Sequence, residues 1–426
     1  MGNATDAAAQ DAARLAERLA WGTVDCLPEG ALAARLRAAS EQGRVLRVKL
    51  GIDPTAPDIH LGHAVVLRKL REFQDAGHRV VLIIGDYTAR VGDPSGRSSL
   101  RPILSGEQIE ANAATFQEQA LRILDPDPER LEVRRNSEWL DMSMIELLGL
   151  MRTTTAAQML ERDDFAKRFA AGEPISMLEL LYPLLQGYDS VAVKADVELG
   201  GTDQKFNLLL GRDIQRAYGE PEQAILTMGI LVGTDGQRKM SKSLGNQIGV
   251  TDAPEEMFGK TMAIPDEAMG QYYRLLLGEE LGAGDGDTAG AGAESDAAGT
   301  GPATGETSAR DAKRALARGI VAWLYTEAEA EAAERHFERV FVQREAPEEI
   351  EEAHFASEEG MLHLPGLIAE EFGISRSEAR RLIDQGGVSL GEEVLGTDEH
   401  NVASERADGQ VLKVGKRRFR RLRAGM

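Results

Sequence analysis

The fold of this chain is most constrained by a strand, a helix and a second strand that follow one another near its N-terminus. Residues 44–51 (RVLRVKLG) have the pattern of a strand, and the apolar spacing then predicts a helix from about residue 61 to residue 76. Residues 80–85 (VVLIIG) are a continuous apolar run, which is typical of a strand buried on both faces of a parallel sheet. A strand, a helix and a strand in this order form a βαβ unit, so we predict an α/β protein. The crossover of such a unit is right-handed by default.

The alternation of helices and strands continues to about residue 250. Apolar periodicity predicts helices at about 6–21, 106–123, 143–151, 176–188 and 203–218, and strands at 131–135 and 224–231. We therefore expect residues 1–250 to form a Rossmann-like, doubly wound parallel sheet with an N-terminal helix.

Residues 251–350 are predicted to form a second, all-α domain that contains one insertion. Residues 279–309 have no aromatic side chain and are rich in Gly, Ala and acidic residues. Such a segment buries too little apolar area to offset its ordering entropy, so we expect a disordered insertion.

Composition points to a soluble protein of the cytoplasm. The longest apolar run is far shorter than the ~20 residues that cross a bilayer, so no membrane partner is expected. The N-terminus lacks the basic and apolar regions of a signal peptide. The single cysteine, Cys26, can form neither an internal disulfide nor a cysteine zinc cluster.

The net charge of −21 is unevenly distributed along the chain. Residues 361–426 carry 11 Lys and Arg against 10 Asp and Glu, a net charge of +1, so the first 360 residues carry −22. The last twelve residues hold six basic side chains and no acidic one. They are either a solvated tail or a phosphate-binding surface, which can work on an acidic body because salt confines each field to ~8–10 Å.

A first polar motif, residues 51–63 (GIDPTAPDIHLGH), lies directly between the first strand and the first helix. His60 and His63 are three residues apart, so both can lie on one side of the first helical turn, where free N–H groups favour anions. Gly62 leaves room for a base or ribose against the backbone. Alone, the histidine pair would more often be a capping or packing feature, and it lacks the third ligand of a zinc site.

A second polar motif, residues 239–246 (KMSKSLGN), follows Gly233, Asp235 and Gly236. Lys239 and Lys242 can place two ammonium groups on one polyphosphate, and a flexible loop would close them over it as charge develops. A solvated basic loop is the ordinary interpretation of this spacing when it is taken alone.

Together, over a parallel sheet, the two motifs resemble the HIGH and KMSKS motifs of class I aminoacyl-tRNA synthetases. Within that class, essentially the whole chain resembles the tyrosyl-tRNA synthetases. The resemblance extends to residues 92–97 (GDPSGR), 181–189 (LYPLLQGYD) and 200–207 (GGTDQKFN). Residues 364–367 (LPGL) and 375–388 (SRSEARRLIDQGGV) are similar to the ribosomal-protein-S-four-like RNA-binding domain.

The resemblance implies an enzyme that attaches L-tyrosine to tRNA(Tyr) in two steps. ATP, entering with Mg, first forms tyrosyl-adenylate with release of pyrophosphate, and the tyrosyl group then moves to the terminal adenosine of the tRNA. Because the tyrosine carboxylate is already an anion, the first step needs charge stabilisation and positioning but no general base. No protein-bound metal is expected.

The resemblance also assigns the groups that act on ATP. The γ-phosphate is assigned to Thr55 and His60, the ribose or phosphate to His63, and the pyrophosphate to Lys239, Lys242 and Arg97. Gly62 and Asp203 complete the expected ATP site, with Asp203 at the ribose.

The residues assigned to the substrate tyrosine lie on one helix face and in three loops. Tyr182, Gln186 and Asp189 lie at i, i+4 and i+7, on one face of a helix. The resemblance implies that Tyr182 and Gln186 hold the ammonium group and that Asp189 accepts the phenolic proton. Asp53 and Asp93 are assigned to the same tyrosine site, with Asp93 at the ammonium group, and Gln204 to the carboxylate.

The chain departs from the commonest bacterial pattern at two places. Lys49 stands where relatives often have a tyrosine that holds the substrate hydroxyl, and the usually small residues 85–90 read GDYTAR, with Asp86 among them. A second branch of bacterial tyrosyl enzymes carries similar replacements. The departures put the details of hydroxyl recognition in question.

The resemblance implies three domains and a tRNA-binding C-terminus. These are a catalytic domain (1–250), an α-helical anticodon-side domain (251–350) and a ribosomal-protein-S-four-like RNA-binding domain (360–426), a small α+β unit. A homodimer is implied by the family. The residues assigned to tRNA are Arg376, Arg380, Arg381, Lys416, Arg417 and Arg418.

Three alternatives remain. A tryptophanyl-tRNA synthetase would share both motifs, but the helix face at Asp189 and the C-terminal unit argue against it. A small-molecule nucleotidyltransferase would not need the C-terminal parts. An RNA-binding protein on an inactive scaffold predicts damaged motifs, whereas His60, His63, Lys239 and Lys242 are all present.

Overall fold

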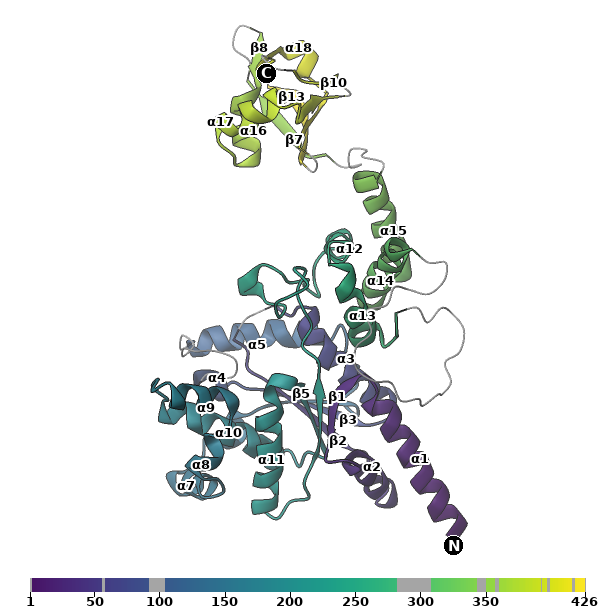
Figure 1. Cartoon of the computed structure of the whole chain (residues 1–426), viewed down its shortest axis with the longest axis vertical. Coiled ribbons are helices and arrows are strands. Elements are labelled where there is room, and N and C mark those ends of the chain that lie inside the picture. Colours follow the sequence, from purple (N-terminus) through teal and green to yellow (C-terminus); the bar gives the residue numbers. More distant parts are fainter. Residues whose placement is uncertain are drawn as a thin grey trace. The chain divides into compact units, whose positions relative to one another are not determined.

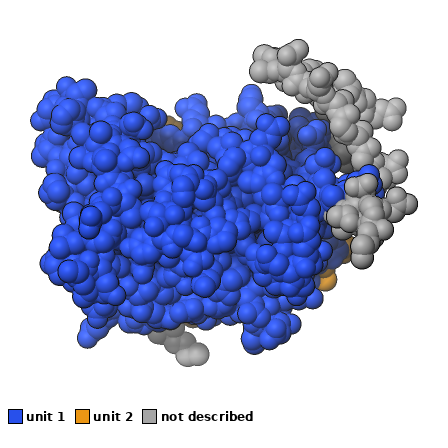
Figure 2. Space-filling view, turned by 90° about the horizontal axis from the view of Figure 1, so that it is seen from below, with its two compact units in different colours: residues 1–327 blue, residues 328–426 orange. Residues whose placement is uncertain are grey.

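The computed structural model describes residues 2–55, 58–91, 104–281, 308–342, 350–356, 360–391, 393–396, 399–415 and 418–425. Within them the chain divides into two compact units, residues 1–327 and residues 328–426, which Figure 2 shows in different colours. The first unit contains a six-stranded sheet, and the second contains a five-stranded sheet and a two-stranded sheet.

The six-stranded sheet has the order β1-β6-β5-β2-β3-β4. Its strands are β1 (Thr23–Leu27), β2 (Arg47–Ile52), β3 (Arg79–Ile84), β4 (Leu131–Arg135), β5 (Val197–Gly201) and β6 (Ala224–Met228). All neighbours are parallel except β1, which pairs antiparallel with β6. The predicted parallel α/β sheet is thus confirmed, and its strand β3 is buried from Val80 to Ile84.

The order of the strands reverses direction between β2 and β5. The chain runs from β2 outward to β3 and β4, then returns to β5 on the other side of β2 and continues to β6. Since crossovers are right-handed, the helices of the two halves lie on opposite faces of the sheet, as Figure 1 shows for α3 (Leu61–Asp75) and α11 (Lys205–Ala217). Ligands of doubly wound sheets bind at such a switch point, beyond the carboxyl ends of the strands.

The other helices of the first unit cover the sheet or extend from it (Figure 1). They are α1 (Gly2–Ala20), α2 (Ala31–Glu41), α4 (Thr88–Val91), α5 (Gly106–Ala120), α6 (Ser137–Leu140), α7 (Met144–Met151), α8 (Ala156–Met159), α9 (Asp163–Ala170), α10 (Met177–Ala192), α12 (Pro254–Met262), α13 (Met269–Tyr272) and α14 (Ala309–Leu324). The expected insertion at 279–309 lies largely outside the described residues, which stop at 281 and resume at 308.

Two strands of this sheet were not predicted from the sequence. The edge strand β1 (TVDCL) is only partly buried and carries Asp25 in its middle, so its apolar pattern is weak. Strand β5 (VELGG) contains a charged residue and two glycines, although all but its last residue are buried. Its burial depends on the ion pair between Glu198 and Lys49, which cannot be predicted from the local sequence pattern.

The second unit is a small α+β body with its own core. Its helices are α15 (Glu327–Phe337), α16 (Leu364–Phe372), α17 (Arg376–Asp384) and α18 (Ser404–Ala407). Its strands are β7 (Glu352–Phe355), β8 (Met361–His363), β9 (Val388–Leu390), β10 (Glu393–Val394), β11 (Asn401–Ala403), β12 (Val411–Val414) and β13 (Arg418–Ala424). Buried Leu364, Ile383, Leu412 and Leu422 belong to one apolar cluster of this unit.

Two features of the second unit concern its sheet. Strand β7 pairs parallel with β13, so the sheet of the second unit begins before residue 360. The basic segment 418–424 is β13, an inner strand of that sheet and no free tail, because β13 pairs on its other side with β12. No described helix is long and apolar enough to span a membrane.

Candidate active site

The two motifs meet at the switch point of the sheet. The first motif follows the end of β2 and leads into α3, and residues 202–204 follow the end of β5, the strand next to β2. The segment directly after the second motif pairs with the first motif, because the amide of Leu61 donates to the carbonyl of Ile248 (2.9 Å) and that of Val250 to the carbonyl of Ile59 (3.1 Å). One helix start, two strand ends and one loop therefore form a single site.

The two histidines stack on each other at the start of α3. Their ring centroids are 4.0 Å apart, and the amide of His60 donates to Nδ1 of His63 (3.3 Å). Burial, together with the nearby charge of Lys239, lowers the pKa of His60 to about 4 and that of His63 to about 3. Both rings are therefore neutral at pH 7. A Cβ on Gly62 would lie 3.0 Å from the His60 ring, so any larger residue at this position would crowd the imidazole.

The lysines of the second motif lie across the site and are paired with carboxylates. Nζ of Lys239 is 2.7 Å from Asp203, and Lys242 forms an ion pair with Asp58. Asp203 follows β5 and Asp58 precedes α3, so the two ion pairs bridge the loop to both strand ends. The sequence pointed to Asp203 but gave no reason to single out Asp58.

Asn246 holds the lysine loop in shape. Its Oδ1 accepts from the amide of Ser241 (2.8 Å), and its Nδ2 donates to Asp235 (3.0 Å) and to the carbonyl of Lys239 (3.3 Å). A Cβ on Gly233 would lie only 2.2 Å from this side chain, so the position accepts only glycine. The loop is thus fixed at its base, while its two lysine side chains are more than half exposed.

Asp53 connects β2 with α4 and α10. It accepts hydrogen bonds from Thr88 (2.6 Å) and from the hydroxyl of Tyr182 (3.1 Å). A Cβ on Gly85 would lie 2.1 Å from the Asp53 carboxylate, so the close approach of the two strand ends requires glycine there. The backbone of Thr55 also folds back onto this turn, donating to the carbonyl of Asp53 (2.8 Å).

Burial strongly perturbs the carboxyl group of Asp189. It is 3% exposed, and it accepts from the indole N–H of Trp139 (2.8 Å). Burial raises its pKa to about 7, while Lys49, Trp139 and Asn136 act in the opposite direction. Trp139 and Asn136 were missed from the sequence, because they lie at the short helix α6, where no periodic pattern marks them.

Lys49 and Asp86, which stand at the two departures from the common pattern, are both engaged within the protein. Lys49 is fully buried, and its Nζ contacts Glu198 (2.8 Å), Ser190 (2.8 Å) and the carbonyl of Gln186 (3.0 Å). Asp86 accepts from the amide (2.9 Å) and the hydroxyl (2.6 Å) of Ser137 at the start of α6. Lys49 therefore supports α10 from beneath, and Asp86 caps a helix.

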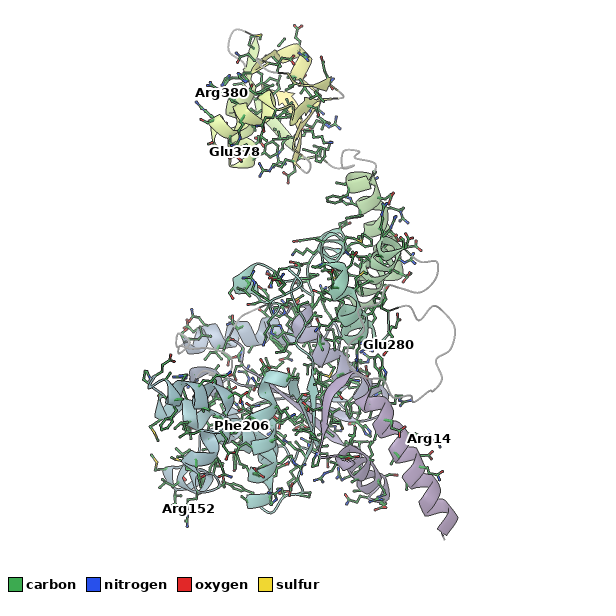
Figure 3. All side chains as sticks on the ribbon, viewed as in Figure 1. Arg14, Arg152, Phe206, Glu280, Glu378 and Arg380 are labelled. Atoms are coloured by element: carbon green, nitrogen blue, oxygen red, sulfur yellow. The ribbon has the colours of Figure 1, made fainter. Side chains whose placement is uncertain are left out.

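Some expected site residues lie outside the described residues, and some lie in the second unit. Asp93 and Arg97, like Lys416 and Arg417, are outside the described residues. Arg376, Arg380 and Arg381 are exposed on α17, where Figure 3 labels Arg380. In the described structure none of these three, nor the exposed Arg418 on β13, forms an ion pair, whereas Arg420 and Arg423 are paired with acidic residues of their own unit.

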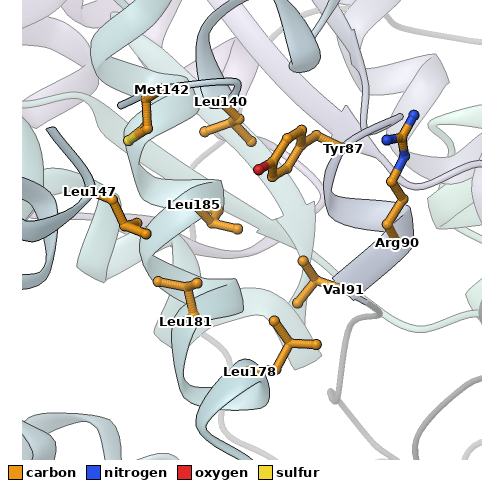
Figure 4. A pocket seen from close by; sticks show the side chains of 9 residues that line it. All are labelled: Tyr87, Arg90, Val91, Leu140, Met142, Leu147, Leu178, Leu181 and Leu185. Atoms are coloured by element: carbon orange, nitrogen blue, oxygen red, sulfur yellow. The ribbon is translucent and has the colours of Figure 1, made fainter. Parts of the chain in front are cut away.

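A cavity of about 330 Å³ lies on another face of α10. It is lined by Tyr87, Arg90, Val91, Leu140, Met142, Leu147, Leu178, Leu181 and Leu185 (Figure 4). None of the predicted substrate residues lines it. Among the described residues, no group of three or more His, Cys, Asp or Glu is arranged to hold a metal ion.

Comparison with known proteins identifies relatives of this chain. A family model described as tRNA synthetases class I (W and Y) matches residues 41–342. A tyrosine–tRNA ligase from Moorella thermoacetica is 50% identical over 97% of this chain and 96% of that protein. A tyrosine–tRNA ligase from Thermotoga maritima is 49% identical over 94% of this chain and 95% of that protein.

Solved structures show the same fold. A C-terminally truncated mitochondrial tyrosyl-tRNA synthetase from Aspergillus nidulans is similar with a TM-score of 0.59 and 20% identity, over 80% of this chain and 100% of that chain. The tyrosyl-tRNA synthetase from Archaeoglobus fulgidus, solved with L-tyrosine, gives a TM-score of 0.55 and 21% identity, over 76% of this chain and 99% of that chain.

The sheet, the two joined motifs and the family model define an enzyme of the class I aminoacyl-tRNA synthetases, in the group that comprises the W and Y enzymes. Within that group the chain belongs to the tyrosine–tRNA ligase family.

Proposed function

We propose that this chain attaches L-tyrosine to tRNA(Tyr) through a tyrosyl-adenylate, using ATP that enters as its Mg complex. The observation that carries the proposal is the joining of the two motifs by backbone hydrogen bonds at the switch point between β2 and β5. It gathers two neutral imidazoles, two lysines and the start of a helix around one space. This set of groups suits a reaction in which phosphate charge must be stabilised and no proton must be abstracted.

In the first step, the attacking group is the tyrosine carboxylate and the leaving group is pyrophosphate. Thr55 and His60 act at the γ-phosphate, and His63 at the ribose or phosphate. A neutral imidazole donates one N–H, so the low pKa values of the two histidines suit hydrogen bonding better than proton transfer. Gly62 lies at this helix start, on the ATP side of the site.

Lys239 and Lys242 leave their carboxylate partners to bind the polyphosphate, together with Arg97. Exposed ion pairs of this kind stabilise a protein by only about 0–1 kcal/mol, so a polyphosphate can replace Asp203 and Asp58 at small cost. Asp203, once released, is available to the ribose. This change of ion-pair partners would couple ATP binding to the position of the lysine loop.

Tyrosine binds between the ends of β2 and β5 and the polar face of α10. Asp189 accepts the phenolic proton, and Tyr182, Gln186, Asp53 and Asp93 surround the amino-acid head group. Gln204 reaches the carboxylate. The hydrogen bond from Tyr182 to Asp53 and the location of Asp189 on the same helix support this arrangement.

In the second step, the C-terminal unit holds the tRNA. Its candidates are four exposed arginines that form no ion pair with any residue the structure describes, together with two further basic residues: Arg376, Arg380, Arg381 and Arg418, with Lys416 and Arg417. The first 360 residues carry a net charge of −22 and repel phosphate, so this unit is the favoured surface for RNA. We further propose that the chain comprises a catalytic domain (1–250), an α-helical anticodon-side domain (251–350) and an RNA-binding domain (360–426).

The enzyme works in the cytoplasm as a homodimer. The dimer is supported by exposed apolar side chains on α7, α9 and the start of α10, a region that a second copy would cover. They are Met144, Ile145, Leu148, Met151, Phe169, Met177 and Leu178. Ile145 is 79% exposed. The change Ile145→Asp should therefore dissociate the dimer into monomers, which sedimentation velocity would detect.

The proposed function is tested by amino-acid-dependent exchange of pyrophosphate into ATP with all twenty amino acids. Tyrosine alone should support exchange, and charging of tRNA(Tyr) should follow when the tRNA is added. Exchange driven by tryptophan would overturn the assignment of substrate. An enzyme without exchange activity, in a folded state, would support the inactive RNA-binding scaffold instead.

A further inference from the structure

The first lysine of the loop lies on a short hairpin. Two backbone hydrogen bonds (2.8 and 3.0 Å) join residues 231–233 to residues 238–240. Between these bonds, Val232 lies directly opposite Lys239 in an antiparallel bridge. In a pair of this kind the Cα atoms are only about 4.5 Å apart, and the amide and carbonyl of each residue point away from the partner strand. The position of Lys239 therefore follows that of Val232.

Helix α13 binds both outward-pointing backbone groups of Val232. The hydroxyl of Tyr272 donates to the carbonyl of Val232 (2.8 Å), and the amide of Val232 donates to Oε1 of Gln271 (3.3 Å). Nε2 of Gln271 donates to the carbonyl of Ile230 (2.9 Å). The two side chains thus take the place that the backbone of a third strand would occupy beside the hairpin. Tyr272 is fully buried, and burial raises its pKa, so its hydroxyl remains a donor.

The helical segment after α12 holds the chain around the lysine loop at two further points. The turn of the hairpin packs against it, because a Cβ on Gly236 would lie 2.4 Å from the ring of Pro265. Beyond the loop, the hydroxyl of Tyr325 at the end of α14 donates to the carbonyl of Asp252 (2.6 Å). The helices therefore hold this stretch of chain at its entry, at its turn and at its exit.

We propose that Tyr272 and Gln271 are positioning residues for adenylate formation, which hold the hairpin at Val232 so that Lys239 meets the polyphosphate in the transition state. The proposal rests on the proposed function and goes beyond it, because it names groups outside both motifs that set the position of this lysine. Both side chains act through the backbone and do not touch the substrate. The effect on rate can be large, since misplacing a reacting group by ~1 Å can cost a hundredfold.

The test is the change Tyr272→Phe, which removes one hydroxyl and keeps the ring. Adenylate formation in single turnovers at saturating ATP and tyrosine should slow about tenfold, as expected for a displacement well below 1 Å. The dissociation constant of tyrosine without ATP, measured by calorimetry, should not change, because the tyrosine residues of the site lie on other elements.

The next residue along the chain offers a matched control. Tyr273 is also buried, and its hydroxyl also donates to a backbone carbonyl, that of Ala312 on α14 (2.7 Å). Tyr273→Phe therefore removes the same kind of hydrogen bond at a point away from the hairpin. Both variants should have a lower melting temperature than the wild type, but Tyr273→Phe should form the adenylate at the wild-type rate.

A double-mutant cycle with Lys239 separates positioning from general destabilisation. If Tyr272 acts through Lys239, Tyr272→Phe should slow adenylate formation much less in a Lys239→Ala background than in the wild type, because the group that it positions is gone. Gln271→Met has a similar length but cannot pair with the backbone of residues 230–232. It should show the same loss of rate and the same dependence on Lys239.

The outcomes distinguish this proposal from the proposed function. A wild-type rate in Tyr272→Phe or in Gln271→Met would overturn the role of that residue. Equal losses with and without Lys239, or an equal loss in Tyr273→Phe, would show that the contacts are only structural. A wild-type enzyme that lacks tyrosine-dependent pyrophosphate exchange would instead overturn the proposed function.

Discussion

Single polar residues in this site are buried where their surroundings decide their charge. Burying a charged group without compensation is costly, so each such group has shifted its pKa or found a partner. Asp189 shows the first solution, because burial raises its pKa to about 7. Lys49 shows the second, because its charge is matched by Glu198 at 2.8 Å on the neighbouring strand. Lys49 also contacts Ser190 and the carbonyl of Gln186 on α10, the helix that carries Asp189.

The pKa of Asp189 predicts a pH dependence of tyrosine binding. The ionised carboxylate accepts the phenolic proton more strongly, and its population rises about tenfold between pH 6 and pH 8 for a pKa of about 7. We expect tyrosine to bind several-fold more tightly at pH 8 than at pH 6. The two histidines do not titrate in this range, since their pKa values are about 4 and about 3. Asp189→Asn should abolish the dependence and narrow the preference for tyrosine over phenylalanine in pyrophosphate exchange.

Stability offers a second measurement of the same group. Because the pKa of Asp189 is raised, the folded state binds this proton more tightly than the unfolded state between about pH 4 and pH 7. The contribution of Asp189 to the free energy of unfolding is therefore greatest at low pH and falls as the pH rises through this range. In urea unfolding, the free energy of unfolding of Asp189→Asn should rise relative to that of the wild type from pH 4 to pH 7. A constant difference would mean that Asp189 has an ordinary pKa.

At the scale of elements, the lysine loop and helix α3 behave as one assembly. The loop is attached to the start of α3 through Leu61 and Ile248, and its shape is held by Asn246. Its lysine side chains extend beyond these fixed points toward Asp58 and Asp203. The backbone of the loop is thus preorganised, while the charged ends remain able to change partner. Preorganised charge of this kind is the largest single source of many enzymatic rate enhancements.

Replacing Lys242 by Ala should therefore affect chemistry and spare amino-acid binding. We expect adenylate formation in single turnovers to slow by ~100-fold or more, the usual range for the loss of one preorganised charge donor. The dissociation constant of tyrosine without ATP should barely change. Lys194→Ala is the control, since Lys194 is exposed and lies 3.8 Å from Glu220 outside the site. Normal adenylate formation in Lys242→Ala would remove this lysine from the mechanism.

At the scale of the whole molecule, charge separates the two tasks of the enzyme. The acidic body contains every residue assigned to ATP and tyrosine. The C-terminal unit contains four exposed arginines, Arg376, Arg380, Arg381 and Arg418, that form no ion pair with a described residue. Each phosphate neutralised by a basic side chain releases counterions, so contacts made by this unit should dominate the salt dependence of RNA binding.

A triple change of Arg376, Arg380 and Arg381 to Ala should therefore weaken tRNA binding while tyrosine activation continues. Pyrophosphate exchange should stay near the wild-type rate, and charging at low tRNA concentration should fall sharply. The slope of log K against log salt should become smaller in magnitude by about two to three units. Arg14→Ala, an exposed change in the first unit, is the control. Unchanged charging by the triple variant would place the tRNA contacts elsewhere.

The sequence predicted those parts of the protein that depend on neighbouring residues along the chain. The run from Val80 to Ile84, the helix that starts at Leu61 and the helix face of Tyr182, Gln186 and Asp189 follow from local periodicity, and the structure contains each of them. Local chemistry also marked both motifs, since histidines at a helix start and two lysines in a glycine-flanked loop are visible in a short window.

What only the tertiary structure decided is the set of partners for the buried polar groups. The pairing of Lys49 with Glu198 joins strands that are neighbours in the sheet but far apart in sequence. Asn207 similarly joins a helix and a strand end, and Asp58 meets Lys242 across the site. A buried polar side chain is stable only with a partner, and the partner is chosen by the packing of the elements. The sequence by itself therefore determined the elements and the chemistry of the motifs, while the fold determined how that chemistry is held and charged, because hydrogen bonding and burial act between residues that only the folded chain brings together.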